Sequence, residues 1–333
     1  MKTRKLGNLE VSSIGMGCMG FTHAYGTTPD ESEGIRLVHL AFDKGCTFFD
    51  TAEMYSYFGN EEFVGKALKE LPRDEVVISD KFWPEKFVGH DFPEDKLSEA
   101  GIRKTLEGQL RRLKTDYIDL YTEHQMRDGN EEAVAEVMGK LITEGKIRAW
   151  GQSSPSADQI RRAHAVTPIA AIQSEYSMME RKWEADVLPL CRELGIGFVA
   201  FSPTGNGFLS GKYSAKDKFM GDDVRRVITR FSEKNMEANQ PLLDLLDRIA
   251  ARKGCTKAQL ALAWILAYGD FTVPIPGMRR DERVIENLGA ADVALTDSEY
   301  AEINTELGKI AIHGNRDGND IKKLGSVPEN VDR

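Results

Sequence analysis

Eight short apolar runs recur along this chain, and each is followed by a segment with helical periodicity. Most runs are continuously apolar, which is typical of parallel strands that are covered on both faces. In the segments between them apolar residues return every three or four positions, as Ile102, Leu106, Leu110 and Leu113 do, which indicates helices with one apolar face. We expect strands at residues 13–17, 47–50, 75–79, 117–121, 147–151, 169–173, 197–201 and 272–275.

Eight strand–helix units in 333 residues fit a closed (β/α)8 barrel, which typically takes about 250 residues plus insertions. An open doubly wound sheet is the alternative. No Gly-x-Gly-x-x-Gly opens a helix after the first predicted strand, which argues against that sheet. We therefore predict an α/β fold, a single (β/α)8 TIM barrel over residues 1–333 with long loops at its C-terminal face.

Three segments fall outside this regular alternation. Residues 85–93 follow the third predicted strand and residues 203–230 follow the seventh. Both lie on the side where the strands end, and long loops of this kind are often functional. Residues 313–333 are polar, so we expect a surface tail there.

Chemically active side chains follow several of the predicted strands. Asp50 ends the second strand, Lys81 follows the third and His124 follows the fourth. Tyr55 lies on the loop after the second strand, and Gln173 ends the sixth. In a (β/α)8 barrel the C-terminal strand ends carry the active site. Each residue alone has a common structural explanation, but their joint position on one rim indicates a site.

A phenol, an ammonium, a carboxylate and an imidazole at one rim can together protonate an oxygen anion. A phenol has a pKa of about 10, too high for an efficient acid at neutral pH, and a nearby ammonium favours the phenolate. A carboxylate beside the ammonium keeps it charged and oriented, and an imidazole can orient a substrate oxygen. Tyr55, Lys81 and Asp50 can thus protonate the alkoxide that forms when hydride reaches a carbonyl, with His124 beside them. Hydride itself requires a cofactor.

The net charge, the length of the apolar runs and the spacing of the cysteines argue against several other classes of protein. The net charge of −9 argues against a nucleic-acid partner, because phosphate contacts need a basic surface. No run approaches the roughly 20 apolar residues of a membrane helix, and no apolar run of a signal peptide follows the basic N-terminus. The four cysteines form no Cys-x-x-Cys pair, so we expect neither disulfides nor a zinc site. We expect a cytoplasmic protein that binds no metal, no nucleic acid and no membrane.

Several longer motifs follow one another at specific spacings. They are Asp50-Thr51-Ala52-Glu53-Met54-Tyr55, Asn60-Glu61-Glu62, Gly65-Lys66-Ala67-Leu68, Asp119-Leu120-Tyr121-Thr122-Glu123-His124, Gln173-Ser174-Glu175-Tyr176-Ser177, Phe201-Ser202-Pro203, Gly207-Phe208-Leu209-Ser210-Gly211-Lys212, Ile275-Pro276-Gly277-Met278 and Glu286-Asn287. With these motifs the chain resembles the aldo-keto reductase family over nearly its whole length. The resemblance implies a (β/α)8 barrel that uses NADPH to reduce an aldehyde or ketone to an alcohol.

The resemblance also assigns roles to individual residues. It implies Tyr55 as the general acid, Lys81 and Asp50 as the pair that tunes it, and His124 as the group that orients the carbonyl. Phe201 would stack on the nicotinamide ring, where the family usually has Tyr, and stacking needs only the ring. The other cofactor-binding candidates are Gln173 and Ser153 at the carboxamide with Ser154 beside them, Ser202, Thr204, Gly205 and Gly207 along the pyrophosphate, Glu286 and Asn287 at the adenine, and Pro203 and Gly277.

Arg279, Arg280 and Arg283 follow the eighth predicted strand at the start of a helical pattern. Guanidinium groups bind a phosphate monoester through fork-like hydrogen bonds, and a helix N-terminus favours the same anion. We therefore favour NADP over NAD, with a solvated basic turn as the alternative interpretation.

Large apolar side chains near the strand ends are candidates for a substrate pocket. They are Phe21, Met54, Phe82 and Trp83. They indicate a small-molecule carbonyl substrate with an apolar or aromatic face, although such residues are more often found in a core.

Three other interpretations remain open. A lysine beyond a barrel strand can form a Schiff base, so Lys81 could serve a lyase or an aldolase. A metal would have to use Asp50, Glu53, Glu123 and His124, but Lys81 in the same site would compete with the cation. The family also includes potassium-channel beta subunits, which bind NADPH as regulatory partners. The sequence carries no signal that fixes an oligomeric state.

Overall fold

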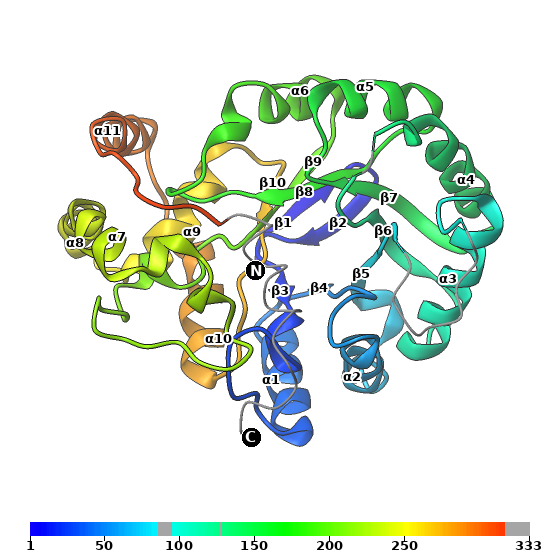
Figure 1. Cartoon of the computed structure of the whole chain (residues 1–333), viewed down its shortest axis with the longest axis horizontal. Coiled ribbons are helices and arrows are strands. Elements are labelled where there is room, and N and C mark those ends of the chain that lie inside the picture. Colours follow the sequence, from blue (N-terminus) through cyan, green and yellow to red (C-terminus); the bar gives the residue numbers. More distant parts are fainter. Residues whose placement is uncertain (86–94, 127, 317–333) are drawn as a thin grey trace.

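Eight parallel strands form one sheet whose order follows the chain, from β3 to β10 (Figure 1). The computed structural model describes residues 1–85, 95–126 and 128–316. The strands are β3 (Met16–Gly17), β4 (Phe48–Asp50), β5 (Val77–Phe82), β6 (Ile118–Glu123), β7 (Ile147–Ser153), β8 (Ala171–Glu175), β9 (Gly197–Phe201) and β10 (Thr272–Pro274). All eight predicted strands are present, with shifted ends.

Backbone hydrogen bonds join the first strand of the sheet to the last. The amide of Gly15 donates to the carbonyl of Pro274 at 3.0 Å, and that of Gly17 donates to the carbonyl of Pro276 at 3.1 Å. A Cβ atom on Gly17 would lie 2.8 Å from the carbonyl oxygen of Ile275, so a side chain here would push the two strands apart. The sheet is therefore a closed barrel, and the predicted (β/α)8 fold is confirmed.

Helices surround the barrel (Figure 1). They are α1 (Glu31–Asp43), α2 (Gly59–Leu68), α3 (Glu99–Leu113), α4 (Glu131–Thr143), α5 (Ala157–Val166), α6 (Val187–Leu194), α7 (Glu233–Ala238), α8 (Gln240–Lys253), α9 (Lys257–Tyr268), α10 (Asp281–Leu288) and α11 (Asp297–Leu307). Ser156, Thr256 and Thr296 each form a capping box that starts a helix, because their side chains satisfy amides that the first turn leaves unpaired.

The alternation of side chains along β5 explains why polar residues lie on the inner side of this strand near its C-terminal end. Ile78 and Phe82 point outward into the core between strands and helices, and Val77 belongs to the core inside the barrel. Side chains alternate along a strand, so Ser79 and Lys81 follow Val77 on the inner side. The predicted strand ended at residue 79 because the apolar run stops there. In the structure β5 continues to Phe82, and Lys81 therefore lies within the strand.

A hairpin precedes the barrel and covers its N-terminal end. Its strands β1 (Thr3–Leu6) and β2 (Leu9–Ser12) pair antiparallel. Leu6 and Leu9 are buried in the core inside the barrel. Gly7 has a φ of 58° and packs closely on Ala170, just before β8. The sequence analysis did not predict this hairpin, although Gly7-Asn8 between apolar residues is a known turn signal.

The two predicted long loops and the polar tail differ in how far the structure describes them. Of the loop predicted at 85–93, residues 86–93 lie outside the described residues. The loop at 203–230 contains the short 3-10 helices Phe208–Ser210, Val224–Arg226 and Thr229–Phe231. Of the predicted tail, residues 313–316 are described, and Figure 1 shows the chain after α11 running toward the middle of the barrel.

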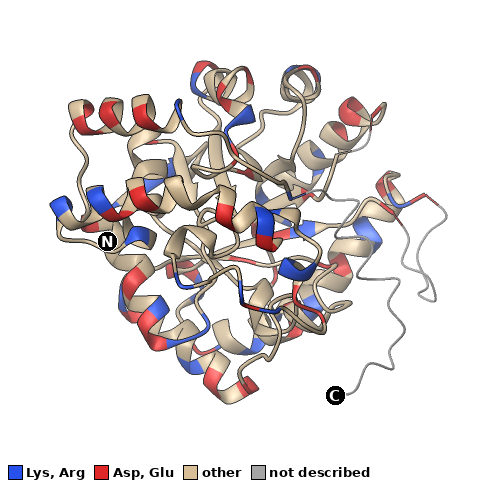
Figure 2. Ribbon diagram, turned by 60° about the vertical axis from the view of Figure 1, so that its left-hand side comes forward, with Lys and Arg blue, Asp and Glu red and all other residues tan. Residues whose placement is uncertain are grey.

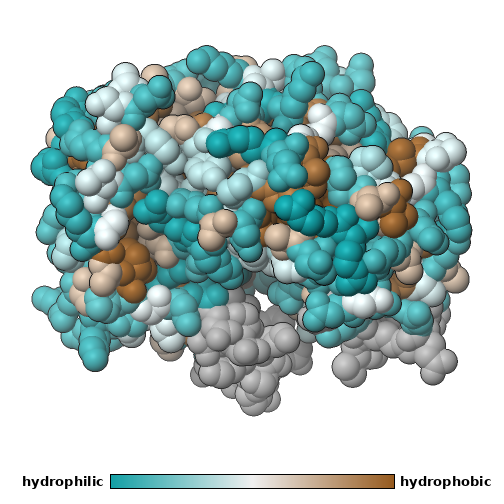
Figure 3. All heavy atoms as spheres, turned by 90° about the horizontal axis from the view of Figure 1, so that it is seen from above, coloured by the Kyte–Doolittle hydropathy of each residue, from teal (hydrophilic) through white to brown (hydrophobic). Residues whose placement is uncertain are grey.

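The described surface is mixed in charge and mostly hydrophilic. In the view of Figure 2, Lys and Arg are interspersed with Asp and Glu along the outer helices. The face in Figure 3 carries apolar residues in small separate areas. Within the described ranges, no helix combines the length and the apolar character that a membrane span requires.

Candidate active site

Asp50 is the centre of a buried polar cluster at the C-terminal ends of β4, β5 and β8. Its Oδ2 atom accepts a hydrogen bond from Lys81 Nζ at 2.7 Å. Its Oδ1 atom accepts from the Ser79 hydroxyl at 2.9 Å and from the Gln173 amide at 2.8 Å. Lys81 also donates to the carbonyl of Thr51. The side chains of Asp50 and Lys81 are 3% and 1% exposed, so each charge depends on the other for stabilisation.

Tyr55 lies beside this ion pair, at the position predicted from the strand ends. Lys81 Nζ is 5.0 Å from the centroid of the Tyr55 ring. Burial raises the pKa of Tyr55, and the charge of Lys81 opposes this shift without cancelling it. The sequence analysis expected a net lowering, but desolvation outweighs the ammonium. The phenol therefore keeps its proton at neutral pH and gives it up only to a strong base.

The charge state of Lys81 limits the chemistry that it can perform. Burial acts to lower its pKa, but the charges of Asp50 and Tyr55 outweigh burial, and the pKa of Lys81 is raised. Lys81 is therefore an ammonium at neutral pH. A Schiff base requires a neutral amine, so this environment argues against the lyase interpretation.

Two imidazoles flank Tyr55. The ring centroid of His124 lies 5.9 Å from that of Tyr55 in an edge-on arrangement, and the centroid of His23 lies 5.5 Å away. Burial, followed by the charges of Lys81 and Arg316, holds the pKa of His124 well below its ordinary value, so its ring is neutral at pH 7. The sequence analysis missed His23, although it lies just after the first barrel strand, where the same strand-end rule applies.

Two of the predicted pocket residues lie at this site. Trp83 packs edge-on against His124, with ring centroids 5.2 Å apart. Met54 precedes Tyr55 and is 39% exposed. Their positions are compatible with the predicted contact to a substrate, which stays a prediction.

The other two predicted pocket residues lie in the core. Phe82 is fully buried and packs against Tyr121 on the outer side of the sheet, with centroids 5.0 Å apart. Phe21 packs against Phe63 of α2 at 4.9 Å. Both rings are thus packed in the core, and their predicted contact with a substrate stays a prediction.

The residues predicted to bind a nicotinamide ring occupy neighbouring strand ends. Ser153 ends β7 and is buried, and Phe201 ends β9 with its ring partly exposed. Gln173 of β8 lies between these strands, and its carbonyl accepts the amide of Ser154 at 3.0 Å. The hydrogen bond from the Gln173 side chain to Asp50 was not anticipated from the sequence.

The segment after β9, which includes Pro203, forms a compact turn. The φ angles of Ser202, Gly205 and Gly207 are 49°, 59° and 94°. The amide of Gly205 donates to Ser202 at 2.8 Å, and that of Gly207 donates to Thr204 at 3.1 Å. The turn therefore has a fixed shape, whereas its predicted contact with a pyrophosphate remains untested.

Two predicted cofactor residues make hydrogen bonds within the protein. The Arg279 guanidinium donates to the carbonyls of Thr27 and Tyr25, both at 3.0 Å. The side-chain amide of Asn287 donates to the carbonyl of Gly277 at 3.2 Å. Arg279 thus holds the loop after β3 in place.

The remaining two arginines lie at the start of α10, where the side chain of Arg283 is 15% exposed. Arg283 pairs with Glu286 at 2.6 Å. Arg280 is 62% exposed and lies 3.3 Å from Glu282. A phosphate could replace either carboxylate partner, because both anions match a guanidinium fork.

A second buried ion pair supports the loop that carries Tyr55. Glu53 Oε2 accepts hydrogen bonds from Lys96 Nζ at 2.9 Å and from the amide of Trp83 at 2.8 Å. The amide of Glu53 donates to the carbonyl of Lys81 at 3.0 Å. Glu53 therefore fixes this loop to the end of β5. Charges 43 positions apart carry no signal of pairing in a single sequence.

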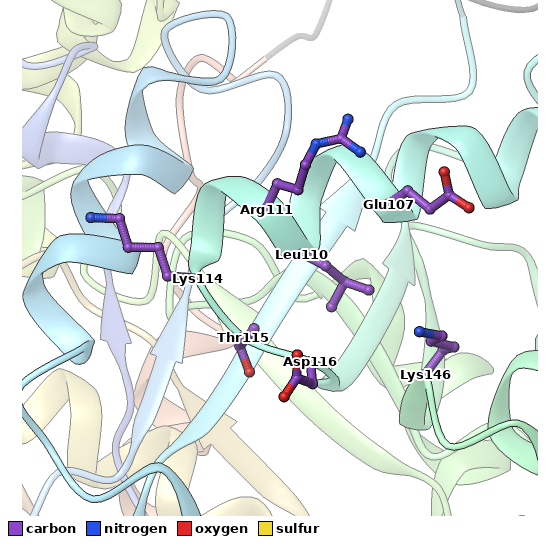
Figure 4. Close-up of a pocket in the computed structure, with 7 residues that line it drawn as sticks. All are labelled: Glu107, Leu110, Arg111, Lys114, Thr115, Asp116 and Lys146. Atoms are coloured by element: carbon purple, nitrogen blue, oxygen red, sulfur yellow. The ribbon is translucent and has the colours of Figure 1, made fainter.

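A separate hollow of about 390 Å³ lies beyond the opposite end of the strands (Figure 4). Its lining residues are Glu107, Leu110, Arg111, Lys114, Thr115, Asp116 and Lys146. They belong to the end of α3 and to the segments just before β6 and β7. The hollow contains no residue of the site around Asp50.

Comparison with known proteins shows the family to which this chain belongs. Residues 13–306 match the model of the Aldo/keto reductase family. The chain belongs to this family. It is 42% identical over 305 residues to "Probable aldo-keto reductase 1" of Glycine max, covering 90% of this chain and 87% of that protein.

Solved structures of this family share the fold over nearly their whole length. The glycerol dehydrogenase from Gluconobacter oxydans is 29% identical, with a TM-score of 0.83 over 93% of this chain and 96% of its own. An aldo/keto reductase from Klebsiella pneumoniae, solved with NADP and acetate, is 28% identical, with a TM-score of 0.71 over 95% of this chain and 99% of its own. The chain is thus an oxidoreductase of the aldo/keto reductase family.

Replacing Lys96 by Met should leave the carboxylate of Glu53 buried without its counterion. We expect a loss of about 3–5 kcal/mol in the free energy of unfolding, measured by urea denaturation. Lys146→Met, at an exposed lysine, is the control. The double variant Glu53→Gln with Lys96→Met should recover part of the loss. A loss below about 1 kcal/mol, the scale of an exposed pair, would show that the pair is not buried as described.

Proposed function

We propose that this protein reduces an aldehyde or ketone to an alcohol with hydride from NADPH, and that Tyr55 is the general acid. The observation that carries the proposal is the buried ion pair of Asp50 and Lys81, which lies beside Tyr55 with His124 against the same phenol ring. The NADP and NADPH complexes of the Klebsiella pneumoniae relatives support the choice of cofactor.

The residues on the rim fit a nicotinamide dinucleotide phosphate. The partly exposed ring of Phe201 offers a stacking face, and the polar side chains of Ser153 and Gln173 lie on the two preceding strands. The turn after Phe201 has small residues, which permit close approach of a phosphate. Arg280 and Arg283 would hold the 2′-phosphate at the start of α10. When bound, NADPH supplies the hydride.

The side chains of the protein donate a proton to the substrate oxygen and stabilise the phenolate that this transfer produces. Tyr55 donates its phenolic proton to the substrate oxygen as that oxygen becomes negative. An alkoxide is a stronger base than a phenolate, so the raised pKa of Tyr55 still permits this transfer. The ammonium of Lys81 stabilises the resulting phenolate, and Asp50 holds Lys81 in place. The neutral ring of His124 orients the substrate oxygen through a hydrogen bond.

Replacing Tyr55 by Phe removes the proton donor and retains the ring. We expect kcat to fall at least about a hundredfold, the scale of general-acid catalysis, in an assay that follows NADPH consumption. Affinity for NADPH, measured by fluorescence titration, should be retained. Tyr57→Phe is the control, since Tyr57 is 65% exposed. Reduction by Tyr55→Phe at a nearly unchanged rate would contradict the assignment.

Replacing Arg280 and Arg283 together by Ala tests whether these two residues bind the 2′-phosphate of NADPH. Arg279 is left in place because it holds the loop after β3. We expect the dissociation constant for NADPH to rise about tenfold or more, the scale of lost hydrogen bonds between charged groups. The constant for NADH should change far less, and both are measured by fluorescence titration. Equal weakening of the two cofactors would show that these arginines do not distinguish them.

A further inference from the structure

Arg316 brings a guanidinium to the rim of the barrel, next to the proposed site of reduction. Its Cζ atom lies 5.0 Å from the centroid of the Phe201 ring. Its positive charge also acts to lower the pKa of Tyr55 and of His124, as a smaller effect than burial and the charge of Lys81. The residue lies far beyond the last barrel strand in the sequence, and no motif marks it.

The chain that leads to Arg316 is held by the long segment after β9. The buried side chain of Asn239 donates to the carbonyl of His313 at 2.9 Å and accepts from its amide at 2.8 Å. The Thr229 hydroxyl donates to Asn315 Oδ1 at 3.0 Å and accepts from the amide of Asn315 at 2.9 Å. The backbone is thus fixed up to the residue before Arg316, so the guanidinium is presented to the rim from an anchored position.

Buried cations elsewhere on this side of the barrel have carboxylate partners. The pairs are Lys81 with Asp50, Arg225 with Asp223, and Arg230 with Glu175. Arg316 makes no ion pair with the residues that the structure describes, and its Nε atom is buried without a hydrogen-bond partner among them. A buried donor without a partner costs free energy, so an anion at this position would be stabilised.

The neighbours of Arg316 define what else such a ligand must offer. The ring of Phe201 lies against Arg316, and on the same rim Trp83 packs against His124, whose ring is neutral. An anionic group on an apolar or aromatic body therefore matches this region. The cofactor's phosphates are assigned to the turn after β9 and to the start of α10, where Arg280 and Arg283 would hold one of them.

We propose that Arg316 binds the carboxylate of the substrate, so that the preferred substrates are aldehydes or ketones that also carry a carboxylate. The inference rests on the proposed function. A carboxylate is ionised at neutral pH, and its two oxygens match the guanidinium fork. Binding of the carboxylate by Arg316 would orient the carbonyl toward Tyr55 and His124.

The test compares 4-carboxybenzaldehyde, which is an anion at neutral pH, with its uncharged methyl ester, using NADPH and the full chain. We expect Arg316→Gln to lower kcat/KM for the acid about ten- to a hundredfold through KM, the scale of a lost charge-assisted hydrogen bond. The value for the ester should change little. The control Arg226→Gln removes an exposed arginine of the loop after β9 and should leave the ratio of acid to ester unchanged.

A second measurement tests the contact between Arg316 and a carboxylate without catalytic turnover. Binding of 4-(hydroxymethyl)benzoate, the product acid, to the NADP complex is followed by calorimetry, and Arg316→Gln should weaken it by a similar factor. If neither aldehyde is reduced by the unaltered protein, the proposed function fails, and calorimetry still decides the role of Arg316. Equal losses for acid and ester would overturn the proposal in favour of a structural role. Tighter NADPH binding by Arg316→Gln with an unchanged ratio would overturn it too, since the guanidinium would then compete for Phe201.

Discussion

A carboxylate and an ammonium that are both almost completely removed from water persist only as a pair, and the site depends on such a pair. Asp50 and Lys81 come from adjacent strands, and Asp50 is also bonded to Ser79 and Gln173. The carboxylate is therefore satisfied on both oxygens and cannot rotate freely. Lys81 Nζ lies 5.0 Å from the centroid of the Tyr55 ring and its charge acts on the phenol, so the electrostatics of Tyr55 depend on the same pair.

The barrel explains why this pair lies at a strand end. The inner side of β5 begins with Val77 in the apolar interior and continues to Ser79 and Lys81 near the rim. The hairpin of β1 and β2 covers the N-terminal end of the barrel and fills its interior with Leu6 and Leu9. The polar side chains of the site therefore lie at the C-terminal end. The ion pair of Glu53 and Lys96 then holds the loop of Tyr55 against the end of β5.

The sequence predicted the barrel and the four catalytic candidates because both depend on local patterns. Apolar runs mark strands, and Asp50, Tyr55, Lys81 and His124 lie at or near strand ends. A local pattern does not predict packing between segments that are distant in the sequence. The burial of Phe82 against Tyr121 is an example, because a run of residues does not show which side of the pleat will face a helix.

Other parts of the site had no local signal at all. The pairing of Glu53 with Lys96 and the approach of Arg316 to Phe201 join segments that are far apart in the chain. The net rise in the pKa of Tyr55 was also missed, because burial cannot be judged from the identity of neighbouring residues. His23 was overlooked although the strand-end rule applied to it.

Direct transfer of hydrogen from the cofactor to the carbonyl carbon is the central claim of this account. The most direct measurement is a turnover with NADPH that carries deuterium at the transferable position of C4, followed by mass spectrometry and NMR of the alcohol. The account predicts one deuterium on the carbinol carbon, and none on that carbon when unlabelled NADPH is used in D2O. Deuterium that enters the carbinol carbon from D2O, or a substrate adduct trapped on Lys81 by borohydride, would contradict it.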